Sequence, residues 1–235
     1  MNKNTYWIGG KHAVYESIKN PNRKVKQVLS SKNLENIPTI IKKKIVNPKQ
    51  IDKLFIQYKN FSHQNIAAEI ETLPKKELKD EVQKIKNVLM LDGITDVGNI
   101  GSILRSALAF SFDAIVIQNK AFNQKNPVIH KNSSGAIEKI NIFEVTNLTR
   151  TLEYLKENNF WSYALDMTGQ ISIMDCNKFS KKNVVILGSE NKGISKNLKK
   201  KSDFIVKIEI SNKVESLNVA VAAAISMAKI NNIKC

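Results

Sequence analysis

Short runs dominated by apolar residues constrain the fold of this chain more than any other feature. Residues 87–92, 114–117 and 183–187 are runs of this kind, and they are typical of strands buried on both faces of a sheet. Helical patterns separate them at residues 102–110 and 148–158. Strands that alternate with helices in this way predict an α/β fold, in which a parallel sheet carries helices on both faces.

A separate pattern precedes these runs and predicts a second, smaller α/β unit. We expect strands at residues 25–29 and 63–70, and helices at residues 12–18, 37–44 and 51–58. These segments together have the length of a small domain.

A charged segment that is poor in large apolar residues, residues 74–81, follows this unit. We interpret it as part of a linker, although a solvated helix within one domain is the alternative. The predicted organisation is an amino-terminal domain at residues 1–72, a linker at residues 73–86 and a second domain at residues 87–235.

The composition favours a polyanionic partner. Lysine and arginine outnumber aspartate and glutamate by 37 to 21, so the formal net charge is +16. Nucleic acid is the usual partner of such a chain, and the alternative is heavy lysine use throughout the proteome of origin. Two cysteines and three scattered histidines provide neither a disulfide framework nor metal-ligand spacing, so no metal is expected. No signal peptide or membrane span is recognisable, and a reducing cytoplasm is the expected compartment.

Three polar loops follow apolar strands and carry the candidate chemistry. They lie at residues 99–105, 187–193 and 208–218. Because ligands of open α/β sheets bind at the carboxyl ends of strands, we expect the loops to face one site. Arg105 is suited to hold a phosphate or carboxylate, unless it is a simple surface arginine. Glu190 is either a site residue or a carboxylate at a helix N-terminus.

The last loop joins a predicted strand to a predicted helix. Residues 205–210 alternate as a strand does, and residues 216–225 predict a buried helix with Ser216 at or near its N-cap. Polar groups at such a position can bind an anion or a polar ligand, although an ordinary buried strand, loop and helix is the simpler interpretation. The chain contains no phosphate loop, no dinucleotide-binding glycine motif and no G-x-S-x-G elbow.

In their order along the chain, the three loops resemble the motifs of the SpoU/TrmH branch of the SPOUT RNA methyltransferases. The first motif, N-x-G-x-x-x-R-x-A, is matched by Asn99, Gly101, Arg105 and Ala107. The second motif, L-G-x-E-x-x-G, is matched by Leu187, Gly188, Glu190 and Gly193. The third motif, a strand followed by S-L-N-V-x-x-A, is matched by Ile208, Ser216, Leu217, Asn218, Val219 and Ala222. The amino-terminal domain resembles the family's L30e-like RNA-binding domain. Residues 10–14 and 63–68 are similar to the subgroup that methylates a guanosine of 23S ribosomal RNA, except that Asn65 stands where a glycine is expected.

The resemblance implies an α/β methyltransferase domain whose carboxyl-terminal segment threads a deep trefoil knot, an exception to the rule that chains are unknotted. It also implies S-adenosylmethionine as cofactor, with contacts from Leu187, Gly188, Gly193, Ile208 and Leu217. The implied active unit is a homodimer with its site near the dimer interface.

The implied reaction is methyl transfer to a ribose 2′-hydroxyl of RNA, with a guanosine of 23S ribosomal RNA as the expected target. Arg105 is expected near this hydroxyl, either as proton acceptor or as phosphate clamp. The clamp is chemically easier, because a guanidinium stays protonated in proteins and is therefore a poor base. Asn99, Glu190, Ser216 and Asn218 are expected to complete the catalytic site.

Lysine-rich surfaces such as residues 42–44 would hold the RNA through salt-dependent contacts, and the amino-terminal domain would select it by shape. Two alternatives remain open. Transfer RNA is one possible substrate. A non-catalytic RNA-binding or ribosome-assembly protein is the other alternative, although the intact Asn99, Arg105, Glu190 and Asn218 argue against it.

Overall fold

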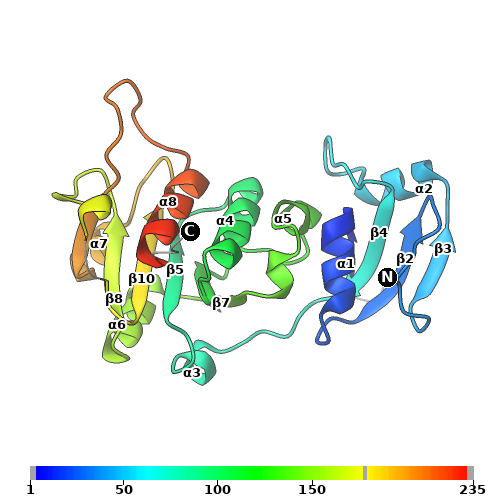
Figure 1. Cartoon of the computed structure of the whole chain (residues 1–235), viewed down its shortest axis with the longest axis horizontal. Helices are drawn as coiled ribbons and strands as arrows, with labels where there is room; N and C mark the ends of the chain where they lie inside the picture. The colour runs from blue at the N-terminus through cyan, green and yellow to red at the C-terminus, as the bar shows by residue number, and fades with distance from the viewer. Residues whose placement is uncertain (1–3, 177–178, 232–235) are drawn as a thin grey trace. The chain divides into compact units, whose positions relative to one another are not determined.

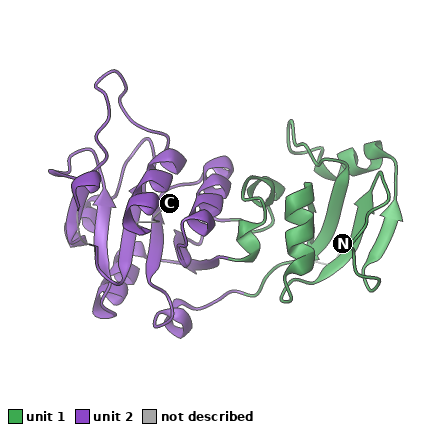
Figure 2. Cartoon of the chain, in the orientation of Figure 1, with its two compact units in different colours: residues 1–74, 123–139 green, residues 75–122, 140–235 purple. Residues whose placement is uncertain are grey.

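The computed structural model describes residues 4–176 and 179–231. The described chain divides into two compact units (Figure 2). One unit comprises residues 1–74 and 123–139, and the other comprises residues 75–122 and 140–235. Each unit is built around its own sheet.

In the larger unit, the described residues form a seven-stranded sheet in the order β7-β6-β5-β10-β8-β11-β9. Every strand pairing in it is parallel, which confirms the predicted parallel α/β architecture. The strands are β5 (Asn87–Asp92), β6 (Ala114–Gln118), β7 (Asn141–Val145), β8 (Trp161–Leu165), β9 (Ile171–Ser172), β10 (Asn183–Gly188) and β11 (Phe204–Lys207). The trefoil knot stays a prediction.

Helices cover both faces of this sheet. They are α3 (Leu78–Glu81), α4 (Val97–Ala109), α6 (Leu148–Glu157), α7 (Lys196–Lys201) and α8 (Val219–Asn231), with a short 3-10 turn η3 (Ile173–Asp175). Helices α4 and α8 contact each other, and α8 contacts β10 (Figure 1). The opposite face packs against α6 and α7.

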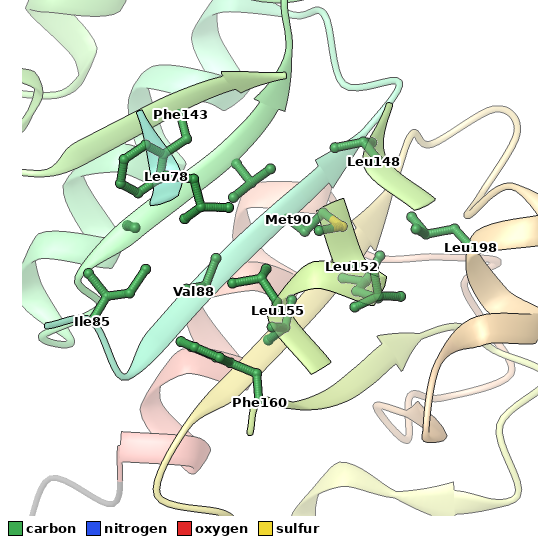
Figure 3. Close-up of a cluster of buried hydrophobic side chains, with 14 of the residues drawn as sticks. Leu78, Ile85, Val88, Met90, Phe143, Leu148, Leu152, Leu155, Phe160 and Leu198 are labelled. Atoms are coloured by element: carbon green, nitrogen blue, oxygen red, sulfur yellow. The ribbon is translucent and has the colours of Figure 1, made fainter. Parts of the chain in front are cut away.

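The core on the α6 and α7 face follows the alternation of the strands (Figure 3). Figure 3 labels Val88 and Met90 from the strands, and Leu148, Leu152, Leu155 and Leu198 from the helices. The strand residues Val116, Val184 and Ile186 belong to the same cluster. A fully buried leucine contributes about 1.5–3 kcal/mol of transfer free energy. This amphipathic packing is why the periodic apolar pattern of residues 148–158 gives a helix.

Two helices begin at different residues from those that the sequence predicted. Helix α4 begins at Val97 rather than residue 102, because the carboxylate of Asp96 accepts a hydrogen bond from the backbone N–H of Asn99 at 2.7 Å. Helix α8 begins at Val219 rather than residue 216. The side-chain oxygen of Asn218 accepts from the N–H of Ala220 at 2.9 Å, so the cap is an asparagine that the prediction placed inside the helix.

The smaller unit contains a mixed sheet in the order β1-β4-β2-β3. Strand β4 is antiparallel to β1 and β2, whereas β3 is parallel to β2. Its elements are β1 (Thr5–Gly9), α1 (Lys11–Lys19), β2 (Val25–Ser30), β3 (Lys42–Ile45), α2 (Pro48–Asp52), η1 (Lys53–Phe55), β4 (Ile66–Glu71), α5 (Pro127–Asn132) and η2 (Ala136–Glu138).

The predicted helix at residues 37–44 is wrong. Residues 42–44 lie in β3, an exposed edge strand whose backbone pairs with β2. Ile40 is 93% exposed, so the apolar pattern of this segment does not mark a buried helical face. Lysines on an edge strand protect it from pairing with other chains.

The turn before β4 forms even though Asn65 stands where the family resemblance predicts a glycine. Gln64 and Asn65 both have positive φ, at 54° and 59°. Asparagine tolerates this left-handed conformation better than other non-glycine residues. The turn is fixed because the carbonyl of Asn65 accepts from the N–H of Ser31 at 3.1 Å.

A buried polar cluster joins residues 123–139 to the rest of the smaller unit. The guanidinium of Arg23 donates to the carboxylate of Glu138 at 2.8 Å and 3.0 Å, and both side chains are almost fully buried. His130 is fully buried, and its Nε2 lies 2.8 Å from the carbonyl oxygen of Gln124. A carbonyl only accepts, so Nε2 carries a proton, and burial favours the neutral form of the ring by lowering its pKa.

We predict that His130 makes the stability of the protein depend on pH. Burial lowers the pKa of His130 from 6.5 to about 4. Because the unfolded chain then binds more protons, stability falls as the pH drops from 6.5 towards 4. The expected loss is about 3 kcal/mol. Denaturant unfolding of the wild type and of His130→Gln at several pH values measures it. An equal fall in both proteins would contradict the assignment.

Candidate functional site

A cavity of about 220 Å³ opens at the carboxyl ends of β8, β10 and β11. Its lining residues are Leu165, Asp166, Met167, Leu187, Gly188, Ser189, Glu190, Gly193, Ile208, Ile210, Ser216, Leu217, Val219 and Ala222. All five residues predicted to contact the cofactor are among them, and so are Glu190 and Ser216 of the predicted catalytic set. The cavity is therefore formed by the second and third motif loops, at the end of the sheet where α/β proteins bind ligands.

Gly188 allows the second motif loop to fold back closely on itself. A Cβ atom at this position would lie 2.1 Å from the backbone carbon of Gly193 and 2.3 Å from the nitrogen of Ile194. Real Cβ atoms do not approach backbone so closely. Gly193 has a φ of 63°, a conformation that L-residues rarely adopt. Both glycines are thus required by the shape of the cavity wall.

A hydrogen-bond cluster connects all three motif loops. The amide nitrogen of Asn218 donates to Oδ1 of Asn99 at 3.0 Å and to Oε1 of Glu190 at 3.1 Å. The same carboxylate oxygen lies 3.5 Å from Nδ2 of Asn99 and 3.4 Å from the N–H of Val219. The carboxylate of Glu190 therefore sits at the N-terminus of α8, where the helix dipole favours a negative charge.

A second cavity, of about 460 Å³, lies beside the first. The two cavities share Ser189, Glu190, Gly193 and Val219. The second one is also lined by residues 92–96 and by Asn99. The sequence predicted a loop from residue 93 onwards but did not indicate residues 92–96 as site residues, although the Asp-Gly pair at residues 92–93 marks the end of β5 and the start of that loop.

Arg105 is not part of this cluster in a single chain. It lies on an exposed face of α4 and lines neither cavity. Among the described residues it has no hydrogen-bond or ion-pair partner. The structure thus brings together Asn99, Glu190 and Asn218, places Ser216 in the wall of the first cavity, and leaves Arg105 outside.

Asp166 is a further polar residue in the first cavity that the sequence did not indicate. Its carboxylate pairs with the ammonium of Lys199 at 2.5 Å and accepts from the backbone of Thr168 at 3.0 Å. Burial by itself raises the pKa of Asp166, but the hydrogen bonds from Lys199 and Thr168 prevail and hold it below its usual value. The group is therefore a fixed negative charge at neutral pH. Only folding reveals this pair, because its members lie far apart in the sequence.

Two sequence-family matches cover most of the chain. Residues 86–228 match the SpoU rRNA Methylase family, and residues 7–76 match the RNA 2'-O ribose methyltransferase substrate binding family. The chain belongs to the SpoU methylase family. It is an RNA methyltransferase.

Similar proteins agree with this membership. An uncharacterized tRNA/rRNA methyltransferase of Borreliella burgdorferi is 32% identical over 92% of this chain and 96% of its own length. A putative TrmH family tRNA/rRNA methyltransferase of Bacillus subtilis is 32% identical over 98% of this chain and 96% of its own. The AdoMet-bound rRNA methyltransferase of Sinorhizobium meliloti has the same fold, with a TM-score of 0.80 at 18% identity over 96% of this chain and 86% of that one.

Two absences concern the described part of the chain only. None of its helices is long and apolar enough to cross a membrane. The same residues contain no group of His, Cys, Asp and Glu side chains that could hold a metal ion.

We predict that Gly188→Ala weakens binding in the first cavity. The added methyl group collides with backbone at residues 193–194, which cannot rotate away as a side chain would. Titration calorimetry with S-adenosylmethionine should show at least a tenfold weaker affinity, about 1.4 kcal/mol. Gly98→Ala, in the first turn of α4, is the matched control and should bind as the wild type does. Unchanged affinity in Gly188→Ala would contradict this account.

Proposed function

We propose that this protein transfers a methyl group from S-adenosylmethionine to the ribose 2′-hydroxyl of a guanosine in 23S ribosomal RNA. The observation that carries the proposal is the cluster of Asn99, Glu190 and Asn218, in which the three motif loops meet between two cavities. The first cavity would hold the cofactor, and the second would admit the ribose.

The residues of the first cavity fit S-adenosylmethionine. Leu187, Ile208 and Leu217 offer apolar walls to a purine ring. Glu190 supplies negative charge that complements a cationic ligand. We assign the cofactor contacts to Leu187, Gly188, Gly193, Ile208 and Leu217, which all line this cavity. When bound, the cofactor supplies an electrophilic methyl group on a positively charged sulfur.

The chemistry needs orientation more than it needs a strong base. The ribose 2′-hydroxyl would take up the methyl group on its oxygen and give its proton to the carboxylate of Glu190, so that the cationic cofactor and the anionic carboxylate would both become neutral. Charge disappears along this path, so a preorganised site shielded from water favours it. Asn99, Asn218 and Ser216 would hold Glu190 and the ribose in place, and Arg105 would clamp the adjacent phosphate.

The RNA partner is supported by charge and by the amino-terminal sequence. The net charge is +16, and residues 42–44 present their lysines on the exposed strand β3. The match of residues 7–76 to a substrate-binding family supports a role in RNA selection. The family that residues 86–228 match is named for ribosomal RNA, which supports ribosomal RNA as the substrate class. We place the protein in the cytoplasm, where that RNA is accessible.

Methyl transfer from labelled cofactor tests the proposal. We would incubate the protein with unmodified 23S ribosomal RNA and, separately, with transfer RNA, and identify the methylated nucleoside. The proposal predicts 2′-O-methylguanosine in 23S ribosomal RNA. Label in transfer RNA alone would replace the proposed substrate, and RNA binding without any transfer would indicate a non-catalytic protein.

We also propose that the active unit is a homodimer formed through α4 and α8. Helix α8 is apolar nearly all round, a composition that belongs to buried helices, yet Val221 on it is 48% exposed. Leu108 on the neighbouring helix α4 is 39% exposed. A second copy that covers this face would remove both side chains from water and would bring Arg105 of one protomer towards the site of its partner.

The dimer proposal predicts that Val221→Lys produces a monomer. A lysine at this position would place a charge in an apolar interface, whereas Ile56→Lys changes a residue that is 84% exposed in the other unit. Sedimentation equilibrium should give the monomer mass for the first variant and the dimer mass for the second. A wild-type protein that is monomeric at the concentrations of the methylation assay would refute the proposal.

Complementation between two inactive variants tests whether Arg105 acts in the partner's site. Arg105→Ala and Glu190→Gln should each abolish methylation while cofactor binding by Arg105→Ala is retained. After the two variants are mixed and allowed to exchange subunits, about a quarter of wild-type activity should return, because each heterodimer contains one intact site. No recovery, in a mixture shown to contain heterodimers, would place Arg105 in its own chain's site.

A further inference from the structure

A polar cavity of about 450 Å³ lies in the smaller unit, separate from the motif loops. Three segments form it: the start of α1, the loop after β2 and the turn before β4. Its lining residues are Lys11, Tyr15, Ser30, Ser31, Lys32, Asn33, Leu34, Glu35, Asn36, Gln64, Asn65 and Ile66. Its volume is within the range of about 300–1,000 Å³ that is usual for small-ligand sites.

The cavity offers hydrogen-bonding groups that the protein itself does not use. The side-chain amides of Asn33, Asn36 and Asn65 have no hydrogen-bond partner among the described residues, and Nε2 of Gln64 is also free there. Each carboxamide presents a donor and an acceptor side by side. This pair of groups matches the edge of a nucleobase, as in the bidentate pairing of asparagine or glutamine with adenine.

The wall of the cavity is held in place by hydrogen bonds between its segments. Oε1 of Gln64 accepts from the N–H of Lys11 at 2.8 Å, so the amide nitrogen of Gln64 has a fixed direction. The hydroxyl of Tyr15 donates to the carbonyl of Glu35 at 3.3 Å. A preorganised site loses less conformational entropy when a ligand binds.

Charge at the cavity favours an anionic ligand. Lys11 and Lys32 are exposed, and neither has an ion-pair partner among the described residues. Glu35 is the single carboxylate among the lining residues. Two ammonium groups around a set of free amides correspond to a nucleotide, whose phosphates are anionic and whose base presents donors and acceptors.

We infer that this cavity binds an unpaired nucleotide of the RNA substrate, with the carboxamides reading its base and Lys11 and Lys32 contacting its phosphates. The inference rests on the proposed function, because it takes RNA to be the substrate. It also fits the way RNA is read, since proteins recognise unstacked bases of loops and bulges on their hydrogen-bonding edges. The cavity lies wholly within residues 7–76, the substrate-binding match.

The test measures binding of the full chain to RNA hairpins that share one stem and differ only in a loop made of A, C, G or U. We expect the wild type to prefer one loop. Asn33→Ala and Asn65→Gly should weaken binding to that loop about tenfold without changing the salt dependence, because they remove base contacts. Glycine at position 65 keeps the positive φ of 59°.

The lysine variants should behave differently. Lys11→Ala and Lys32→Ala should weaken binding to every hairpin and lower the slope of log affinity against log salt by about 0.7–1 each, because they remove phosphate contacts. Lys19→Ala, at the other end of α1, is the matched control and should bind as the wild type does.

Equal binding of all loops by the wild type, or wild-type binding by the carboxamide variants, would overturn the inference. Cofactor affinity and methyl transfer to 23S ribosomal RNA are measured in parallel. If the cavity variants bind RNA and transfer methyl groups as the wild type does, the cavity does not bind the RNA substrate, and the proposed function still stands. If the wild type prefers one hairpin loop, the carboxamide variants lose that preference, and no RNA is methylated, the inference stands and the proposed function is wrong.

Discussion

The parallel pairing of β5 with β10 is the constraint on which the site depends. Gly188 pairs with Asp92, so these two strands end at the same level. The loops that follow them therefore start side by side, although nearly a hundred residues separate them in the chain. One leads to Asn99 at the start of α4, and the other carries Glu190. Asn218, at the start of α8, then closes the cluster by donating to both.

The cluster combines rigidity with exposure. Its carboxylate accepts hydrogen bonds from Asn218 and from the backbone of Val219, which fixes its direction without burying it. Behind it, the close approach of Gly188 to residues 193–194 fixes the cavity wall. Such preorganisation suits a reaction in which charge is lost, because the groups around the reacting atoms need not move.

Much of this arrangement could be predicted from the sequence, since it depends on local patterns. Apolar runs predicted the central strands, and the resemblance to the family's motifs pointed to five residues that all line one cavity. The helix starts at Val97 and Val219 were missed, because capping by Asp96 and Asn218 competes with apolar periodicity in setting a boundary. The helix predicted at residues 37–44 was wrong because tertiary pairing with β2 outweighs local pattern.

Contacts between distant segments could not be predicted. The pairing of Asp166 with Lys199 and the buried pair of Arg23 with Glu138 both join segments that have no sequence signal for each other. The same holds for the packing of residues 123–139 with the smaller unit. Arg105 has a clear sequence motif but no contact with the site, because in a single chain it lies outside the cavity.

The central claim is that the second and third motif loops build a cofactor site at the carboxyl ends of the strands, which the Glu190 cluster joins to the first motif loop. A crystal structure of the protein with S-adenosylhomocysteine tests it most directly. We predict that the ligand lies in the first cavity, which Leu187, Ile208 and Leu217 line. Its sulfur should point towards the second cavity, at Glu190, which lines both cavities. A ligand bound elsewhere on the protein, with this cavity empty, would contradict the claim.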